Sequence, residues 1–262
     1  MPISALMRAA VSGMIGQKAN LDVIANNLAN VNTTGYKSSR LNFQDALYQA
    51  SRLATTNRDL RVGAGIVPVG VQPMFSQGAM KSTDVPTDIA IYGNGFFQVQ
   101  LANGQTGYTR NGAFRVDANG TLVTADGSVL VPNITVPDQI EQGSFTVDPG
   151  GVVRVIRAGQ TESVVIGQLQ LATFPNPEGL EAVGQTVFIQ TQASGGATVG
   201  LPNTPGFGQV FDHSLEFSNV DMAEEMSNLV TPNAPTASPY GRCRRSTRWS
   251  AWPTTCGRDS ER

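Results

Sequence analysis

Apolar residues recur every seven positions near the start of the chain. Two interleaved series share this spacing: Met7, Met14, Leu21 and Leu28, and, three positions further on, Ala10, Gln17, Ile24 and Val31. The a/d spacing predicts an amphipathic helix with a narrow seam of the coiled-coil type. Most other positions are small or polar, so this helix needs a partner for its seam. We expect the seam, Gln17 apart, to pack against other subunits and to be partly exposed in a monomer; an ordinary helix lying on a domain is the alternative.

The stretch from Val31 to Lys37 predicts the end of this helix. Gly35 can adopt the left-handed conformation that closes a helix, and Tyr36 can pack back on the last turn. A weaker helical signal continues beyond Lys37, carried by Leu41, Phe43, Ala46, Leu47 and Tyr48.

The middle of the chain has the pattern of an antiparallel β domain. Short alternating runs are separated by four Asx-Gly pairs, which are typical hairpin turns: Asn103-Gly104, Asn111-Gly112, Asn119-Gly120 and Asp126-Gly127. A second set of β-type runs follows up to residue 201. We expect an independently folded sandwich or barrel over residues 83–201.

A second amphipathic helix is predicted to begin at Val220 and to end before Pro232. Its apolar positions Met222, Met226 and Leu229 are the expected packing residues of that helix. The fold class is therefore α+β, with coiled-coil-type helices at the N-terminus and, in truncated form, near the C-terminus, around a mainly antiparallel all-β middle domain.

Five segments are expected along the chain. They are a helical region over residues 1–48, an extended or β connecting segment over 49–82, the all-β outer domain over 83–201, a return segment with the start of the second helix over 202–231, and a tail over 232–262.

Composition and charge narrow the function classes. The net charge of −2 argues against nucleic acid as the main partner, and no apolar run is long enough to span a bilayer. The N-terminus lacks the pattern of a cleaved signal peptide. His213 is the only histidine, and Cys243 and Cys256 have no histidines at metal-ligand spacing. We expect no catalytic residues, no cofactor and no metal site.

Several segments resemble the flagellar rod and hook family. Residues 25–37 are similar to its N-terminal signature, whose motif positions here are Ala25, Asn26, Asn27, Leu28, Ala29, Asn30, Thr33, Thr34, Gly35 and Tyr36. Residues 88–97 and 108–114 look like its middle-domain motifs, and residues 215–221 resemble the run into its C-terminal helix. The resemblance covers residues 5 to about 231.

The resemblance implies a structural subunit of the rod in the flagellar basal body. Residues 174–181 are similar to a segment typical of distal-rod subunits. In this family the terminal helices line an inner tube, the β domain packs outside, and identical subunits stack helically into a shaft that transmits torque from motor to hook. The implied partners are further copies of the chain, the proximal rod, hook and P- and L-ring proteins, and the flagellar export apparatus. The implied location is the periplasm-spanning rod, reached without a cleaved signal peptide.

An alternative function from another class stays open at this point. The chain could be a secreted β-domain protein that binds or hydrolyses carbohydrate and carries a helical leader. A saturable small-molecule site would favour that alternative, whereas rods that form on concentration would favour the structural subunit.

The tail has a composition foreign to the rest of the chain. Residues 232–262 contain no Leu, Ile, Val, Phe or Met, but both cysteines, both tryptophans, four prolines and six arginines. Such a segment cannot build an apolar core. Loss of one base after the Thr231 codon would permit Ala-Gln-Arg-Ala-Tyr from Pro232 onward, which resembles the usual text of the family's C-terminal helix. We interpret the tail as a frameshifted, disordered reading of that helix; a natural basic tail is the alternative.

Overall fold

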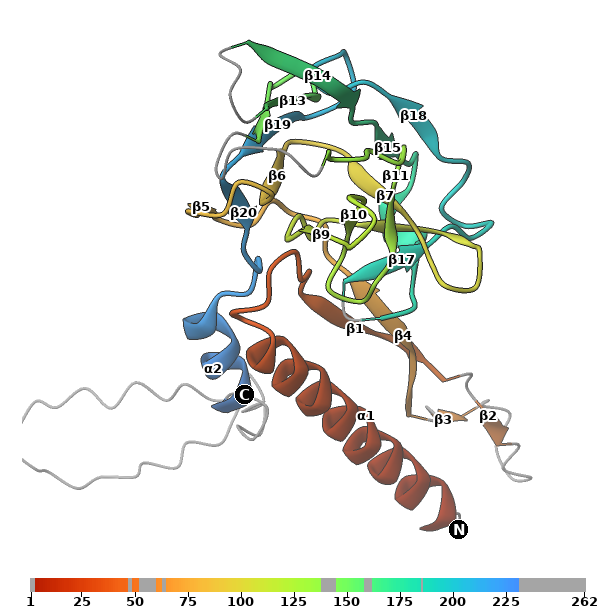
Figure 1. The fold of residues 1–262 in the computed structure, drawn as a ribbon. Coiled ribbons are helices and arrows are strands. Elements are labelled where there is room, and N and C mark those ends of the chain that lie inside the picture. Colours follow the sequence, from red (N-terminus) through yellow and green to blue (C-terminus); the bar gives the residue numbers. More distant parts are fainter. Residues whose placement is uncertain are drawn as a thin grey trace, which may run out of the picture.

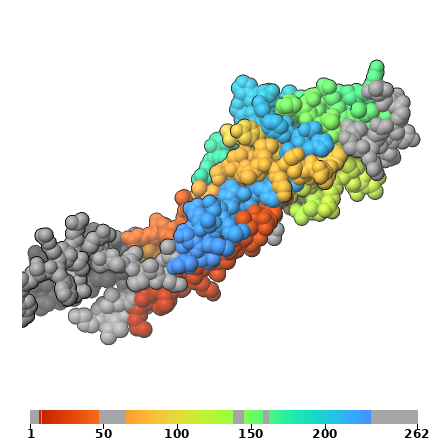
Figure 2. All heavy atoms as spheres, turned by 90° about the vertical axis from the view of Figure 1, so that its left-hand side faces the viewer, coloured from red at the N-terminus to blue at the C-terminus, as the bar shows by residue number. Residues whose placement is uncertain are grey.

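The structure is a computed structural model that describes residues 3–46, 49–51, 60–62, 65–137, 145–157, 162–184 and 186–230. Two helices and a mainly antiparallel β region confirm the predicted α+β class. The molecule is elongated: the helices lie at one end and most of the β region lies at the other (Figure 2).

The N-terminal helix, α1, runs from Ile3 to Ala29 and is roughly 40 Å long at 1.5 Å per residue. Gly35 has a φ of 69°, the left-handed conformation expected from the sequence. It lies in a turn beyond the helix, however, because α1 ends six residues earlier. The hydroxyl of Tyr36 donates to Asn27 Oδ1 across 3.1 Å, so Tyr36 packs back on the last turns as predicted.

The predicted continuation of the helix beyond Lys37 is wrong. Leu41 and Phe43 lie in a strand, β1 (Ser39–Asp45), which pairs antiparallel with β4 (Ile66–Pro73). Ala46 follows that strand, and residues 47 and 48 lie outside the described residues. Short apolar runs do not distinguish helix from strand, and here the ladder with β4 supplies the backbone partners. The β1–β4 ribbon runs alongside α1 (Figure 1).

Three further two-stranded sheets occur within the described residues, and two of them join distant parts of the chain. Their pairs are β2 (Gln49–Ser51) with β3 (Leu60–Val62), β5 (Met80–Ser82) with β20 (Ser214–Glu216), and β6 (Ile89–Tyr92) with β19 (Gln209–Asp212). The last two pairs bring the return segment back across the start of the β region, so the chain leaves that region close to where it entered.

The largest sheet has nine strands, all paired antiparallel. Its main path is β16 (Glu181–Ala182), β17 (Val187–Ile189), β8 (Thr106–Thr109), β7 (Phe96–Gln100), β11 (Val129–Val131), β10 (Leu122–Val123) and β9 (Arg115–Val116); β15 (Leu171–Thr173) pairs with β7 and with β18 (Thr198–Gly200). A three-stranded sheet of β12 (Thr146–Val147), β13 (Val152–Ile156) and β14 (Ser163–Gln168) packs against it, and a short 3-10 helix, η1, spans Pro177–Gly179.

Three of the four predicted Asx-Gly turns join neighbouring strands. Gly104, Gly120 and Gly127 all have positive φ and lie between β7 and β8, β9 and β10, and β10 and β11. The fourth prediction is wrong: Gly112 follows β8 without turning into a hairpin. Its carbonyl accepts from Ile89 N, and a Cβ there would overlap Ile89 O, so close backbone approach explains this glycine.

Two apolar clusters occupy opposite faces of the largest sheet. Phe97 belongs to the main core between the sheets, with Ile89, Leu130, Leu171 and Val210 among its fully buried members. Its neighbour Phe96 points to the other face, as alternation along a strand requires. There Phe96 meets Phe75, from the segment after β4, edge to face at 5.2 Å. This second cluster joins the β region to the helical end.

The second predicted helix is present as α2, Met222–Val230. Asp221 Oδ1 accepts from the Ala223 amide at 2.8 Å and so caps its first turn. Pro232, the predicted stop, lies outside the described residues. The helix lies beside the C-terminal end of α1 (Figure 1).

Candidate assembly site

The first half of α1 presents an open apolar surface. Met7 is 63% exposed and Met14 is 64% exposed, and Ala10 is exposed between them. Val11 and Ile15, which the seven-residue spacing did not select, are 46% and 56% exposed. We call Met7, Val11, Met14 and Ile15 the α1 stripe. A helical period of 3.6 residues, rather than 3.5, would have pointed to Val11 and Ile15.

The second half of the predicted seam is covered. Leu21, Leu28 and Val31 are half-buried, and Ile24 is only 5% exposed, unlike the partial exposure expected for this position. The seam therefore changes character along α1, from open near the N-terminus to covered near the β region.

A different face of α1 holds the β1–β4 ribbon. Gly16 is buried, and a Cβ at this position would lie 2.8 Å from Ile66 Cδ1 and 3.1 Å from Phe43 Cε1. The hydroxyl of Ser12 accepts from Ile66 N at 3.3 Å. Small residues thus let the ribbon lie close against the helix and leave the α1 stripe free.

The second helix adds a smaller open surface. Met222 and Met226 are 45% and 49% exposed, Val230 is 76% exposed, and Leu229 is half-buried. None of the residues of α2 is buried. We call Met222, Met226 and Val230 the α2 stripe. A nine-residue helix without buried side chains has little packing to stabilise it in an isolated chain.

Two asparagines, one on α1 and one before α2, bond the segments that connect the helices to the strands. The buried Asn27 donates from Nδ2 to Ser39 O at 2.9 Å and to Glu225 Oε1 at 2.8 Å, and its Oδ1 accepts from Ser39 N and from the Tyr36 hydroxyl. Asn219 plays the same part before α2: its Oδ1 accepts from Ser38 N at 2.7 Å. Both side chains satisfy backbone groups where regular structure ends.

A buried ionic cluster lies next to these asparagines. Lys37 Nζ lies 2.6 Å from Glu216 Oε1, and Arg110 Nη1 lies 3.4 Å from Glu216 Oε2; all three side chains are almost completely buried. Lys37 also donates to Ser76 O, and Arg110 Nη2 donates to Gly93 O. We call Lys37, Arg110 and Glu216 the Glu216 cluster.

Burial shifts the pKa values of three side chains in and beside this cluster. It lowers the pKa of Lys37, an effect that the charge and hydrogen bond of Glu216 oppose. Burial also lowers the pKa of Arg110, again opposed by Glu216, and raises the pKa of Tyr36. The two cations therefore depend on a single carboxylate for compensation.

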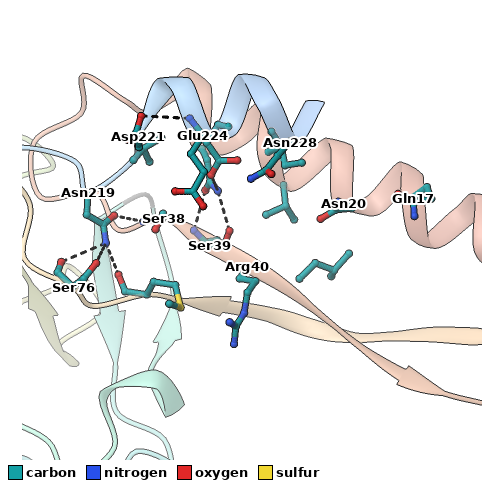
Figure 3. Close-up of a pocket in the computed structure, with 17 residues that line it drawn as sticks. Gln17, Asn20, Ser38, Ser39, Arg40, Ser76, Asn219, Asp221, Glu224 and Asn228 are labelled. Carbon is teal, nitrogen blue, oxygen red and sulfur yellow. Dashed lines mark hydrogen bonds between the residues drawn. The ribbon is translucent and has the colours of Figure 1, made fainter. Parts of the chain in front are cut away.

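A polar cavity of about 690 Å³ lies between α1, α2 and the start of β1. Figure 3 shows Asn20 on α1 and Glu224 and Asn228 on α2 around it, with Asn219 bonded to Ser38 and Ser76 at one end. The hydrogen bond from Asn27 to Glu225 spans the two helices at this cavity.

The family-motif residues build the turn that connects α1 to the strands. Asn30 Nδ2 donates to Asn26 O, Thr33 Oγ1 donates to Asn30 Oδ1, and Thr34 Oγ1 donates to Asn111 Oδ1 in the β region. Ala25 and Ala29 are exposed, whereas Gly35 and Tyr36 are buried. The motif thus contributes polar pairing at the junction, whereas the α1 stripe lies outside it.

Sequence reasoning did not select the residues of the Glu216 cluster or Asn219. Arg110, Glu216 and Asn219 occur in segments that resemble the family, but nothing in their local pattern indicates burial. Their roles depend on segments far apart in the chain, which only the fold brings together.

The sole histidine, His213, lies between β19 and β20 with a φ of 48°, and its Nδ1 is 3.5 Å from Asp212 Oδ2. Within the described residues, no group of three or more His, Cys, Asp or Glu side chains could hold a metal ion. None of the helices in that same part of the chain combines the length and apolar character that crossing a bilayer requires.

Comparison with known proteins matches the N-terminal helix with the turn after it, and part of the β region, to flagellar family models. Residues 7–37 match the family model described as flagella basal body rod protein, and residues 90–155 match the flagellar hook protein FlgE/F/G D1 domain. The chain is 42% identical to the flagellar basal-body rod protein FlgG of Borreliella burgdorferi over 86% of this chain and 89% of the relative. It is 41% identical to FlgG of Caulobacter vibrioides over 86% and 88%, and 45% identical to the flagellar hook protein FlgE of Helicobacter mustelae over 46% and 28%.

Proposed function

We infer that this chain, which belongs to the family of flagellar basal-body rod proteins, polymerises through the exposed stripes of its two helices. As a member of that family it is a structural subunit of the flagellar rod. The observation that carries the inference is the α1 stripe, where Met7 and Met14 are both more than 60% exposed on a helix that extends beyond the β region (Figure 1).

Packing energetics support these stripes as subunit contacts. Burying one large apolar side chain contributes roughly 1.5–3 kcal/mol. The four residues of the α1 stripe are exposed in the monomer, so burying them between subunits would stabilise the assembled rod substantially. A contact between the stripe of one copy and a different surface of the next is heterologous, and such contacts generate helical filaments when the rotation between copies does not close a ring. We propose that the two stripes meet neighbouring subunits together with the predicted positions Ala10 and Leu229. The other predicted seam positions, Leu21, Ile24, Leu28 and Val31, are half-buried or buried within the chain.

The position in the rod follows from the family resemblance. We propose the distal rod as the site of assembly, with residues 174–181 as the supporting segment. Proximal rod, hook and P- and L-ring proteins are the proposed neighbours, and the flagellar export apparatus, acting without a cleaved signal peptide, is the proposed route. The role is mechanical: a stiff shaft that carries torque from motor to hook.

The carbohydrate-binding or hydrolytic alternative is not supported by the comparisons. The relatives that match along most of the chain are named as basal-body rod proteins, and the shorter match is named as a hook protein. We propose that the chain has no enzymatic activity of its own.

The proposed segment boundaries are those expected from the sequence, and the tail is part of that proposal. Residues 232–262 lie outside the described residues. If they are a frameshifted reading of a longer C-terminal helix, the chain as written lacks apolar layers that the tube wall needs. DNA sequencing across codons 225 to 262 tests this directly: a compensating insertion or deletion supports the frameshift, and an unbroken frame in the natural locus excludes it.

Assembly can be tested by sedimentation and electron microscopy of two forms, the chain as written and the frame-restored chain. We expect both to be monomeric at low concentration. On concentration, the frame-restored form should give rods and the written form should assemble weakly. Equal assembly of both forms would contradict the role given to the tail, and the absence of rods from both at every concentration would contradict self-assembly.

A further inference from the structure

The strand β20 ends on Glu216, a residue that links three other parts of the chain to its own segment. Glu216 is 1% exposed, and its Oε1 accepts from Lys37 Nζ at 2.6 Å and from Gly78 N at 2.9 Å. Its Oε2 faces Arg110 Nη1, and its backbone carbonyl accepts from Gly35 N at 2.8 Å. One residue therefore links the turn after α1, the segment after β4, the end of β8 and the chain leading into α2.

The charges of the Glu216 cluster do not balance within the cluster. Two buried cations face one carboxylate, and the remaining compensation comes from two backbone carbonyls and from the ring of Phe96, whose centroid lies 5.3 Å from Arg110 Cζ. The Nε of Arg110 is buried without a hydrogen-bond partner. A well-packed apolar group of similar volume is often no less stable than a buried ion pair, so such clusters are weak evidence for stability alone.

What the cluster offers is a defined geometry. A carboxylate with both oxygens occupied tolerates few orientations of its partners, whereas apolar surfaces can slide. The cluster connects the helical end of the molecule to the β region. Gly35 and Lys37 lie in the segment that follows α1, and Arg110 belongs to the β region.

We propose that Glu216 is a positioning residue that fixes the direction of the two terminal helices relative to the β domain. The consequence for rod geometry rests on the proposed function, because subunits stack regularly only when helices and β domain keep one angle. The positioning itself is a property of the monomer.

The test measures two distances by pulsed electron paramagnetic resonance in the full-length monomer at low concentration. Spin labels at Lys18→Cys and Ser163→Cys, both exposed, report on α1 relative to the β region. A second pair, Asn103→Cys with Ser163→Cys, reports on the β region alone. Cys243 and Cys256 are replaced by serine in every sample.

Two variants separate positioning from stability. Glu216→Gln keeps the shape but removes the charge that both cations share. The triple variant Lys37→Met, Arg110→Met, Glu216→Leu removes all the buried charge and restores apolar packing. Asp148→Asn is the matched control, because it breaks a 3.0 Å ion pair with Arg154 whose side chains are 44% and 47% exposed.

Both cluster variants should broaden the distance distribution between positions 18 and 163 and leave that between 103 and 163 unchanged, whereas Asp148→Asn should change neither. An unbroadened first distribution in both variants would overturn the proposal. Loss of the second distance in both would also overturn it, because the cluster would then be needed to fold the β region. Since the monomer is measured, failure of wild-type rods to form would count against the proposed function and not against this result.

Discussion

Asn27 and Glu225 are 198 residues apart in the chain, and Asn27 Nδ2 donates to Glu225 Oε1 across 2.8 Å. This bond joins α1 to α2, the two helices that carry the exposed stripes. Asn27 also bonds both backbone groups of Ser39, so one amide fixes the strand and the second helix against the first. The two stripes therefore keep a defined spacing before any subunit contact forms.

Replacing Asn27 with alanine should loosen α2. The substitution leaves the Ser39 backbone groups without their partner, which should cost about 1–3 kcal/mol in the free energy of unfolding. Amide hydrogen exchange in α2 should accelerate, since Glu225 loses its bond to α1. Asn26→Ala is the matched control on the same helix: Asn26 is exposed, its side chain accepts an exposed hydrogen bond from Asn30 Nδ2, and the expected change is within about 0.5 kcal/mol. Equal exchange rates in the two variants would contradict the role of Asn27.

The sequence predicted elements whose signal is local. The helix α1, three Asx-Gly hairpins and the helix α2 each depend on residues within a few turns of one another, and all of them occur in the structure. The strand at Leu41 and Phe43 was missed because its partner, β4, follows only after a long connection. Weak helical spacing could not show that this ladder was available.

The residues of the candidate site also divide into those with a local sequence signal and those without one. Periodicity identified Met7 and Met14, whose exposure depends on the helix face alone. It could not identify Glu216 as a buried carboxylate, because burial there depends on Lys37 and Arg110 arriving from other parts of the fold. Ile24 shows the same limit: it belongs to the predicted seam, as Met14 does, but lies near α2 and the start of β1, where α1 is covered.

The β domain should fold by itself, and the return strands should add to its stability. A fragment of residues 83–201 is expected to give a strand-type circular dichroism spectrum and a cooperative melt. A fragment of residues 80–216 should melt at a higher temperature, because it adds β19, whose Val210 is fully buried in the main core. That side chain alone contributes roughly 1.5–3 kcal/mol. A helical spectrum of the shorter fragment, or identical melts, would contradict these expectations.

Stability should fall in alkaline solution through Tyr108. Burial raises the pKa of Tyr108 above the ordinary tyrosine value of about 10. The folded chain therefore keeps the phenol proton when the unfolded chain releases it, and the stability present below pH 10 is lost as pH rises toward the folded pKa. Urea unfolding at a series of pH values should show a steeper loss above pH 10 for the wild type than for Tyr108→Phe. Parallel curves would refute this assignment.

The most direct test of the proposed assembly surface uses a strain that lacks its own rod protein. The strain receives the frame-restored chain, its Met14→Lys variant, or its Val165→Lys variant, and isolated basal bodies are viewed by electron microscopy. Met14 is 64% exposed on the α1 stripe and Val165 is 57% exposed on the β domain, so the two variants place a charge at similarly open positions. We predict complete rods with the unsubstituted chain and with Val165→Lys, and few or none with Met14→Lys. Complete rods in equal number from Met14→Lys would contradict the claim that the α1 stripe joins subunits in the rod.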